Sequence, residues 1–206
     1  MINPNKYPVI LFDFGAVLVD WSPYYLYRKV MASDEEIKAF LDEIDFKNWN
    51  PQFDKGYPFE WGVEEKCAQF PHHAEMIRRF NSHWLDSMGE VMLETVEIAR
   101  RLKEAGYTLY GLSNWSTSKF NLVKERMIFL QYLDGYLLSG EVKQIKPDAE
   151  IFHTLLNRLG QPAEKCLFID DSAANIQTAQ ELGFQTIRFT SAGQLKKELS
   201  AKGIVL

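Results

Sequence analysis

Four apolar stretches of this chain end in polar groups that could do chemistry together. In chain order the groups are a carboxylate, a hydroxyl beside an amide, an ammonium and a pair of carboxylates, contributed by Asp13, Ser113-Asn114, Lys146 and Asp170-Asp171. Three carboxylates brought near one point repel one another and need a cation to neutralise them. Ligand sets made only of oxygen favour Mg²⁺, which usually keeps several waters and also binds substrate phosphate. The end groups therefore predict a Mg²⁺ site suited to a phosphorylated substrate.

These groups meet only if the apolar stretches are neighbouring strands of one sheet. Short buried runs predict strands at 9–13, 107–112, 136–138, 166–170 and 185–189. Helical periodicity predicts the helices between them, at 94–105, 119–126, 148–159 and 173–182. This alternation predicts a doubly wound, Rossmann-like α/β fold with a mainly parallel sheet and right-handed crossovers. In such sheets, ligands bind outside the carboxyl ends of the strands.

Residues 22–90 interrupt the alternation, because they contain helical patterns and no convincing strand. Ser33 and Glu36 form a capping box ahead of apolar residues at helical spacing. Three of the five tryptophans fall in this segment and a fourth, Trp21, directly precedes it, which suits a small lobe that needs its own core. The predicted domains are an α/β core of residues 1–21 and 90–206 and an inserted α-helical cap of residues 22–89.

Composition and charge limit the classes of molecule that this protein is expected to bind. The chain has 206 residues, a net charge of −5 and no block of Lys or Arg, so nucleic acid and anionic membranes are poor partners, while a small anionic substrate is still allowed. The amino terminus lacks the pattern of a secretory leader, and no apolar run approaches the roughly 18 residues that span a bilayer. The two cysteines, Cys67 and Cys166, are expected to be reduced. These observations predict a cytoplasmic protein and give no indication of its oligomeric state.

The motifs at the strand ends resemble those of a known family. In this order and spacing, "FDFGAVLVD", "LSN", "KP" and "FIDDSAANI" are similar to the motifs of the haloacid dehalogenase-like (HAD) superfamily. Residues 22–90 look like the helical cap of that superfamily, so the resemblance covers nearly the whole chain. Within it, the chain is most similar to the sugar-phosphate phosphatases whose first motif also reads Asp-x-Gly, such as the bacterial α-glucose-1-phosphate phosphatases.

The resemblance implies a role for each acidic or basic strand end. Asp13 would be the nucleophile that forms an aspartyl-phosphate. The backbone carbonyl of Gly15 and the side chain of Asp170 would bind Mg²⁺ together with Asp13, and Asp171 would lie close to the ion. Lys146 would neutralise charge on Asp13 and on the transferring phosphoryl group.

The resemblance also implies which residues surround the phosphate. Ser113 and the backbone of Asn114 would hold phosphate oxygens. Asn175 stands one helical turn after Asp171 and would orient a metal ligand or Lys146. Trp115 directly follows the phosphate-binding pair and is our candidate for a wall of the substrate pocket.

Gly15 occupies the position at which most phosphatases of this superfamily carry a second aspartate. That aspartate protonates the leaving oxygen and then activates water, a contribution of about 10²–10⁴ in rate. Three explanations remain open: another side chain substitutes, the substrate has a good leaving group, or the enzyme is slow or inactive. Asp20 is one substitute, although its position suits a hinge or a helix N-cap better. A cap histidine reaching into the cleft is another, from the set His72, His73 and His83.

The predicted function is a Mg²⁺-dependent phosphatase that acts on a small phosphorylated metabolite, with a sugar phosphate as the expected class. A metal-independent 2-haloacid dehalogenase is an alternative, because those enzymes also lack the second aspartate. Their fourth motif replaces the paired acids with neutral residues, however, whereas Asp170 and Asp171 are both present here. A second alternative is a phosphate-binding or regulatory protein on the same fold, whose chemistry is blunted by Gly15.

Overall fold

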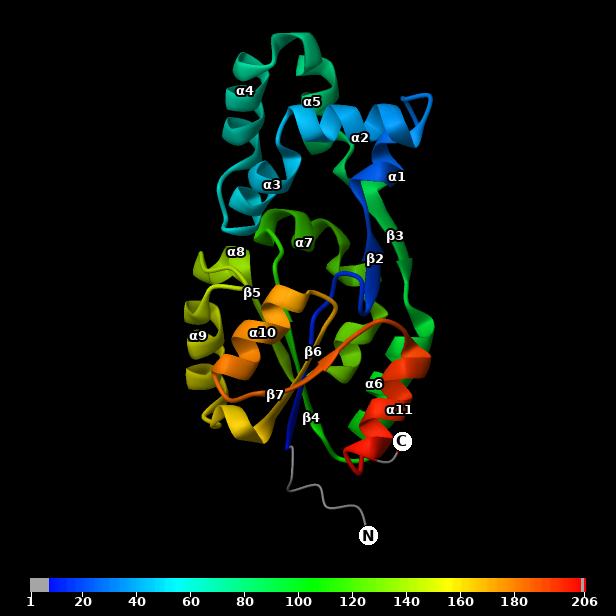
Figure 1. Ribbon diagram of the computed structural model, residues 1–206, viewed down its shortest axis with the longest axis vertical. Helices are drawn as coiled ribbons and strands as arrows, with labels where there is room; N and C mark the ends of the chain where they lie inside the picture. Colours follow the sequence, from blue (N-terminus) through cyan, green and yellow to red (C-terminus); the bar gives the residue numbers. More distant parts are fainter. Residues whose placement is uncertain (1–7, 205) are drawn as a thin grey trace.

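The computed structural model describes residues 8–204 and 206, and its centre is a parallel sheet (Figure 1). The sheet has five strands in the order β5-β4-β1-β6-β7, and all of its neighbouring strands are parallel. Their bounds are β1 Val9–Phe12, β4 Thr108–Ser113, β5 Gly135–Leu138, β6 Cys166–Asp170 and β7 Gln185–Arg188. The predicted doubly wound α/β fold is therefore confirmed, and each predicted strand is present to within about a residue at either end.

Helices cover both faces of this sheet, and the side chains of β1 point alternately into the cores on the two faces. Ile10 and Phe12 of β1 point into a core that includes residues of α6 (Leu93–Glu104) and α11 (Ala192–Ala201). Val9 and Leu11 point the other way, into a core with α9 (Ala149–Leu159) and α10 (Ala173–Glu181). Because successive strand residues alternate in direction, a strand buried on both faces must be apolar at every position. This explains the unbroken apolar run that opens the chain's first motif.

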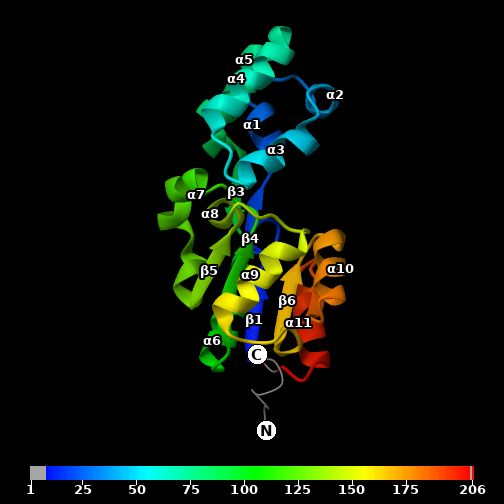
Figure 2. The same cartoon turned by 90° about the vertical axis from the view of Figure 1, so that its left-hand side faces the viewer.

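A group of helices lies beyond the carboxyl ends of the strands, and we call it the helical lobe (residues 23–87; Figures 1 and 2). Its members are α1 Pro23–Tyr27, α2 Asp34–Glu43, α3 Phe46–Asp54, α4 Phe59–Gln69, η1 Pro71–His73, α5 Ala74–Ser82 and η2 Trp84–Ser87. The lobe is built around aromatic rings: Trp49, Phe53 and Phe80 contact one another with ring centroids 5.0–6.1 Å apart. Most of the aromatic side chains in this segment thus form its own core, although Trp61 is 66% exposed.

Two antiparallel strands connect the lobe to the sheet. β2 (Val19–Trp21) pairs with β3 (Met88–Val91), and the backbone N–H of Ser22 donates to the carbonyl of Ser87 at 2.9 Å. The expectation that residues 22–90 contain no strand is therefore wrong for β3. Its sequence, MGEV, is short, contains glycine and is only partly buried, so it lacks the apolar run that identifies the central strands. Its strand conformation comes from its pairing with β2.

The remaining connections differ from the sequence-based expectation in one place. The predicted helix at 119–126 begins two residues earlier as α7 (Thr117–Val123), capped by the Ser116 side chain, and continues as a 3₁₀ turn, η3 (Lys124–Arg126). The other short elements are η4 Ile128–Tyr132, α8 Ser139–Val142 and η5 Ala163–Lys165. Within the part of the chain that the structure describes, no helix is long and apolar enough to cross a membrane. Residues 1–7 of the predicted core segment, where no leader pattern was found, lie outside the described residues.

We expect a methyl group at Gly111 to destabilise the fold. Gly111 lies in β4 opposite Phe12, and a Cβ there would lie 2.4 Å from the ring of Phe14. Overpacking of this kind typically costs about 1–3 kcal/mol, so Gly111→Ala should lower the free energy of unfolding measured with urea by that amount. Gly193→Ala is the matched control, because its Cβ would meet no atom closer than 4.0 Å on exposed helix α11, where alanine is favoured. Equal stability of the two variants would contradict this packing.

Candidate active site

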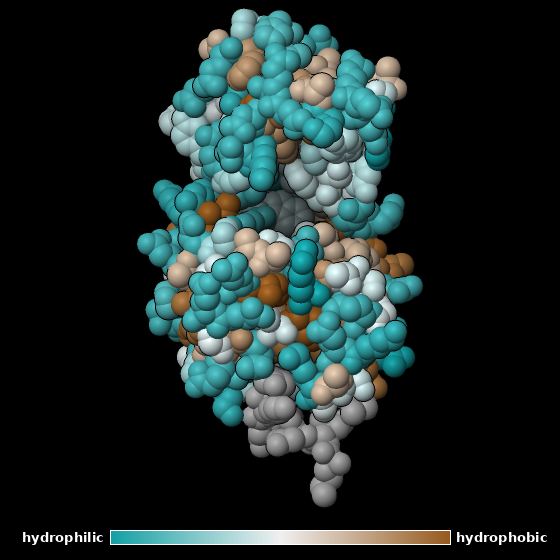
Figure 3. All heavy atoms as spheres, in the orientation of Figure 1, coloured by the Kyte–Doolittle hydropathy of each residue, from teal (hydrophilic) through white to brown (hydrophobic). Residues whose placement is uncertain are grey.

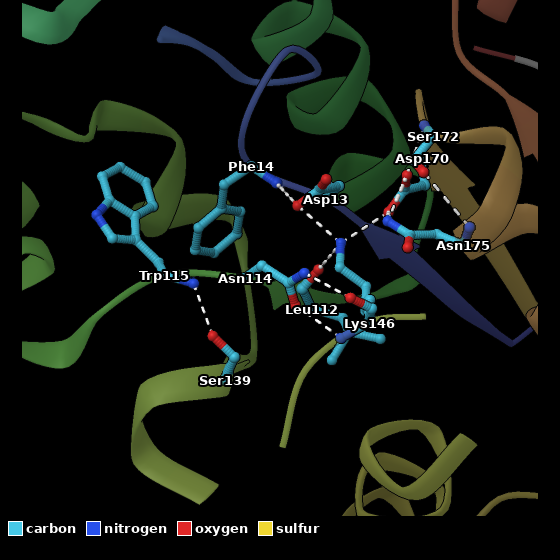
Figure 4. A network of polar contacts seen from close by, with 10 residues as sticks. All are labelled: Asp13, Phe14, Leu112, Asn114, Trp115, Ser139, Lys146, Asp170, Ser172 and Asn175. Atoms are coloured by element: carbon cyan, nitrogen blue, oxygen red, sulfur yellow. Dashed lines mark hydrogen bonds and ion pairs between the residues drawn. The ribbon is translucent and has the colours of Figure 1, made fainter. Parts of the chain in front are cut away.

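The ammonium group of Lys146 lies between two carboxylates from different strands (Figure 4). Its Nζ is 2.9 Å from Oδ1 of Asp13, which follows β1, and 2.7 Å from Oδ2 of Asp170, at the end of β6. It also donates to the carbonyl of Leu112 in β4 at 2.9 Å. The Lys146 side chain is only 1% exposed. One buried cation thus ties together the carboxyl ends of the three central strands.

The Asp170 carboxylate is fully buried, and the start of α10 holds it in place. The Asn175 side-chain amide donates to both of its oxygens at 3.0 Å. The backbone N–H of Ser172, which caps α10, donates to Oδ1 at 2.8 Å. These bonds, with the ammonium of Lys146, satisfy a charge that burial alone would strongly disfavour. Asn175 therefore contacts a predicted metal ligand, at the position where the sequence placed it.

Asn114 fixes the backbone of Lys146. Its side-chain amide donates to the carbonyl of Lys146, and its side-chain oxygen accepts from the N–H of Lys146, both at 2.9 Å. This pair of bonds links the end of β4 to a loop 32 residues further along the chain. The Asn114 side chain is thus engaged with the loop, while its backbone remains the part predicted to hold phosphate.

The three carboxylates expected at the site do converge. One oxygen each from Asp13, Asp170 and Asp171 lie within 4.8 Å of one another. Both contacts of Asp13 involve Oδ1, namely the ammonium of Lys146 and the N–H of Phe14 at 2.7 Å, and Oδ2 has no partner among the described residues. Of the three side chains, that of Asp171 is the most exposed. This cluster of hard oxygen donors fits a Mg²⁺ ion, which binds one or two carboxylates and keeps several waters.

Burial sets the protonation behaviour of the cluster. Removal from water raises the pKa of Asp13 to about 7, with the ammonium of Lys146 opposing the shift and the charge of Asp170 adding to it. Burial also raises the pKa of Asp171, and the neighbouring Asp170 adds to that shift. A cation bound between the carboxylates would favour their ionised forms. The site is therefore arranged to gain from a bound cation.

Gly15 leaves open space beside the cluster. A Cβ built on Gly15 would meet no atom within 4 Å, and its φ does not lie in the left-handed region. The structure thus has room for a side chain at this position, and the sequence supplies none. The turn that contains Gly15 leads directly into β2, so it forms part of the junction between the sheet and the helical lobe.

A cavity of about 120 Å³ opens from this turn toward the helical lobe. Figure 3 shows the surface narrowed and hollowed between the lobe and the body that carries the sheet. Residues of the sheet side, of β2 and of the lobe contribute to its walls: Gly15, Ser113, Asn114, Trp115, Ser116 and Lys119; Val19 and Trp21; Asn50, Asp54, Phe59 and Trp84. The cavity has the scale of a small molecule rather than of a macromolecule. Trp115, our candidate for a wall of the pocket, lines this cavity, and so does Ser113, whose predicted role is to hold phosphate.

Comparison with known proteins assigns the chain to a family. Residues 7–183 match the family model of haloacid dehalogenase-like hydrolases. The chain belongs to this family of hydrolases.

Individual relatives show what the chain is similar to. It is 24% identical to D-ribitol-5-phosphate phosphatase of Bacteroides thetaiotaomicron, over 93% of this chain and 96% of that protein. It is 22% identical to (S)-2-haloacid dehalogenase 4A of Burkholderia cepacia, over 89% and 83% of the two chains. Among solved structures, a HAD family enzyme from B. thetaiotaomicron in complex with magnesium and inorganic phosphate shares the fold, with a TM-score of 0.67, 24% identity and coverage of 90% and 95%.

The side chains considered as substitutes for the missing acid lie elsewhere in this HAD-like hydrolase. Asp20 lies in β2, where it accepts a hydrogen bond from the hydroxyl of Tyr25, and Ser22 is the N-cap of α1 instead. His72 and His73 both contact Glu43 on the surface of the lobe. His83 contacts the hydroxyl of its neighbour Ser82. Asp20 and the three histidines are all absent from the cavity wall among the described residues.

Two charged residues in the cavity wall were missed by sequence reasoning. Asp54 ends α3, and burial raises its pKa to about 8, with a hydrogen bond from the Ser116 backbone opposing the shift and the charge of Asp13 adding to it. Lys119 lies in α7, and its ammonium donates to the side chain and carbonyl of Asn81 at 2.6 and 3.1 Å. Sequence reasoning missed them because neither residue belongs to the motifs that follow the strands. In the sequence, Asp54 stands out only as an acid directly before Lys55-Gly56 in a segment rich in aromatic residues. This pattern does not show which part of the molecule the side chain contacts.

Removal of the buried cation should destabilise the protein strongly. Lys146→Met leaves Asp13 and Asp170 buried without their common partner, and loss of one member of a buried ion pair costs about 3–5 kcal/mol. We expect that loss in urea unfolding of the metal-free protein at pH 7. Lys55→Met is the control, because Lys55 pairs with Asp148 at 3.2 Å on the surface, where a pair is worth about 0–1 kcal/mol. Similar small losses in both variants would show that the Lys146 pairs are not important for stability.

The stability of the protein should depend on the protonation of Asp54. The folded protein retains the Asp54 proton up to about pH 8, whereas the unfolded chain releases it near pH 4. Between these values the folded state binds more protons, so this carboxyl makes the free energy of unfolding fall as pH rises. Asp54→Asn removes that dependence. The melting temperature of the variant relative to wild type should therefore increase from pH 5 to pH 8 in metal-free buffer. A constant difference would contradict the raised pKa.

Proposed function

We propose that this HAD-like hydrolase is a Mg²⁺-dependent phosphatase of a small phosphorylated metabolite. The observation that carries the proposal is the cluster in which Lys146 bridges Asp13 and Asp170 beside Asp171. It combines a nucleophile, a buried cation and hard oxygen ligands, and it adjoins the cavity through Gly15 and through Asn114, which is hydrogen-bonded to Lys146. This is the set of groups that phosphoryl transfer needs, because that reaction depends mainly on positioning and on neutralising charge. The phosphatase named among the relatives supports the same choice.

The paired acids Asp170 and Asp171 favour phosphoryl transfer over the displacement of a halide. A dehalogenase is among the relatives, and its similarity extends over 89% of this chain. Displacement of halide from a neutral carbon centre uses no metal, and extra carboxylates near the nucleophile would only repel an anionic substrate. In this chain Asp170 and Asp171 both lie within 4.8 Å of Asp13. Such a cluster is useful only when a cation is bound to it.

The proposed reaction begins with attack by a carboxylate oxygen of Asp13 on phosphorus, which forms an aspartyl-phosphate as the alcohol departs. The ammonium of Lys146 favours the ionised form of Asp13 and neutralises charge on the phosphoryl group. The Ser113 hydroxyl and the Asn114 backbone N–H hold the phosphate oxygens at the end of β4. Mg²⁺, when bound by Asp13, Asp170, Asp171 and the Gly15 carbonyl, supplies positive charge to the transferring group. Water then attacks the aspartyl-phosphate and releases inorganic phosphate.

We propose further that residues 22–89 act as a cap on a core made of 1–21 and 90–206, with the β2–β3 ribbon as the hinge. The contacts between the two parts include the rings of Trp84 and Trp115, with centroids 6.2 Å apart, and several polar contacts. Examples are the surface pair of Lys55 with Asp148 at 3.2 Å and the hydrogen bond from the Ser139 hydroxyl to the carbonyl of Asp54 at 2.6 Å. Closure would exclude water and so strengthen the electrostatic interactions at the phosphoryl group.

The walls of the cavity favour a polyhydroxylated substrate such as a sugar phosphate. Trp21, Trp84 and Trp115 offer flat faces, and the indole N–H groups of Trp21 and Trp115 are buried without a hydrogen-bond partner among the described residues. Asn50 and Lys119 add further donors to the same wall. Flat aromatic faces beside hydrogen-bond donors suit a ligand that has a ring and several hydroxyl groups.

Phosphate release from a panel of sugar and nucleotide monophosphates tests the proposal. Wild type should release phosphate from at least one ester with Mg²⁺ and from none in EDTA. Asp13→Asn should lower turnover by roughly a thousandfold or more, because the nucleophile is gone. Asp42→Asn, at an exposed ion pair on the lobe, should leave turnover unchanged. If the folded wild-type protein hydrolyses no ester while it binds Mg²⁺ and phosphate, the phosphate-binding alternative is correct instead.

A further inference from the structure

The cavity lacks an acid on its sheet side and has one on its lobe side. Gly15 contributes no side chain, and the space next to its Cα is open to 4 Å. Across the same cavity, Asp54 is the one carboxylate in the wall among the described residues. An alcohol that leaves from a phosphoryl group on Asp13 would depart into this cavity, because Gly15 and the predicted phosphate-binding residues Ser113 and Asn114 all line it. The argument rests on the phosphatase function proposed above.

Asp54 is fixed by the sheet side as well as by its own helix. Its carboxylate accepts a hydrogen bond from the side chain of Asn50 at 3.3 Å, and the backbone of Ser116 lies close enough to favour its ionised form. Its backbone carbonyl accepts the bond from the hydroxyl of Ser139, a side chain that also receives the N–H of Trp115 at 2.8 Å. The end of α3 is thereby attached to the loop that directly follows the Ser113-Asn114 pair. The carboxyl is therefore oriented with respect to the site, although it belongs to the lobe.

The charges around Asp54 suit a group that gives up and takes back a proton. Burial disfavours the carboxylate, the backbone N–H of Ser116 favours it, Asp13 disfavours it and Lys146 favours it, with a resulting pKa of about 8. Lys119 is a further cation in the cavity wall, and Asn81 holds its ammonium. A general acid works best when its pKa lies near the working pH, because both of its forms are then accessible.

We propose that Asp54 is the general acid and base of the reaction, in place of the aspartate absent at Gly15. In the first step an Asp13 oxygen forms a bond to phosphorus, the bond from phosphorus to the ester oxygen breaks, and that oxygen takes the Asp54 proton to leave as the alcohol. In the second step the Asp54 carboxylate takes a proton from water as the water oxygen attacks phosphorus. The bond from phosphorus to Asp13 breaks, which releases phosphate and returns both carboxyl groups to their starting forms.

This role is distinguishable from a role in substrate binding by its dependence on the leaving group. An alkoxide is a poor leaving group and needs a proton, whereas 4-nitrophenolate leaves as a stable anion and does not. The ratio kcat/KM reports the steps up to alcohol departure. A lost hydrogen bond to the substrate would instead raise KM, and a general distortion of the site would slow both esters equally.

The test compares Asp54→Asn with wild type on an alkyl phosphate that wild type hydrolyses and on 4-nitrophenyl phosphate. We expect kcat/KM for the alkyl phosphate to fall about 10²–10⁴-fold, and that for the nitrophenyl ester to fall less than about tenfold. Hydrolysis of the nitrophenyl ester should show a burst of one nitrophenolate per active site, since the second step has lost its base. Equal losses of kcat/KM for the two esters, or the absence of a burst, would overturn the proposal.

Two controls separate the possible failures. Asp45→Asn changes an exposed aspartate at the other end of α3, where asparagine tolerates the left-handed backbone (φ 51°), and it should leave both esters unaffected. Gly15→Asp combined with Asp54→Asn adds a carboxyl where space is open, and it should restore at least a tenth of the lost kcat/KM on the alkyl phosphate. No recovery in a folded double variant would count against the assignment. Wild type that hydrolyses neither ester would instead contradict the phosphatase function itself.

Discussion

The ion pairs of Lys146 with Asp13 and Asp170 are the interaction on which the rest of the structure depends. An ammonium and two carboxylates with so little exposure would be unstable apart, because each charge loses its hydration on burial. Together they hold the ends of β1 and β6 at one point, and the bond to Leu112 adds β4. The two hydrogen bonds of Asn114 to the Lys146 backbone then fix the loop that delivers the cation. Much of the polar structure at the sheet edge serves to keep this one side chain in place.

A cluster of this kind has three carboxylates and one fixed cation, so it carries excess negative charge near a site where an anion must react. A divalent ion would resolve that conflict, and its positive charge would favour both the ionised form of Asp13, the proposed nucleophile, and the binding of a phosphate group. The same arrangement disfavours displacement of halide, in which no ion is present. Our proposal of phosphate over halide chemistry therefore rests on Asp170 and Asp171 more than on Asp13.

The helical lobe completes the site rather than only covering it. It contributes aromatic walls, the amide of Asn50 and the carboxyl of Asp54 to a cavity whose other half comes from the sheet. In the proposed reaction Gly15 leaves the sheet side without a proton donor, so the lobe has to supply one. If the proton donor lies on a part of the molecule that moves, proton transfer becomes possible only in the closed state. Closure and catalysis would then be coupled by geometry.

The sequence by itself determined the fold and the order of the groups at the sheet edge. Unbroken apolar runs identify buried parallel strands, and the carboxyl ends of such strands must lie side by side, so Asp13, Ser113, Lys146 and Asp170 could be placed together from their positions alone. The strand β3 could not be found in this way, because a short, half-exposed segment with glycine becomes a strand only through its partner. The boundaries of the two predicted domains, which pass through this ribbon, remain a prediction.

Only the tertiary structure decided which residue of the lobe faces Gly15. Asp54 ends a helix in a segment rich in aromatic residues, and periodicity shows which of its neighbours form a core but not where the end of the helix points. Its position depends on a bond to Ser139, 85 residues away, and on the backbone of Ser116, and neither contact leaves a local pattern in the sequence. Burial and charge act on a carboxyl only after such contacts have formed. The groups of the sheet edge follow from local pattern, whereas the acid of the cavity follows from how the lobe is set against the sheet.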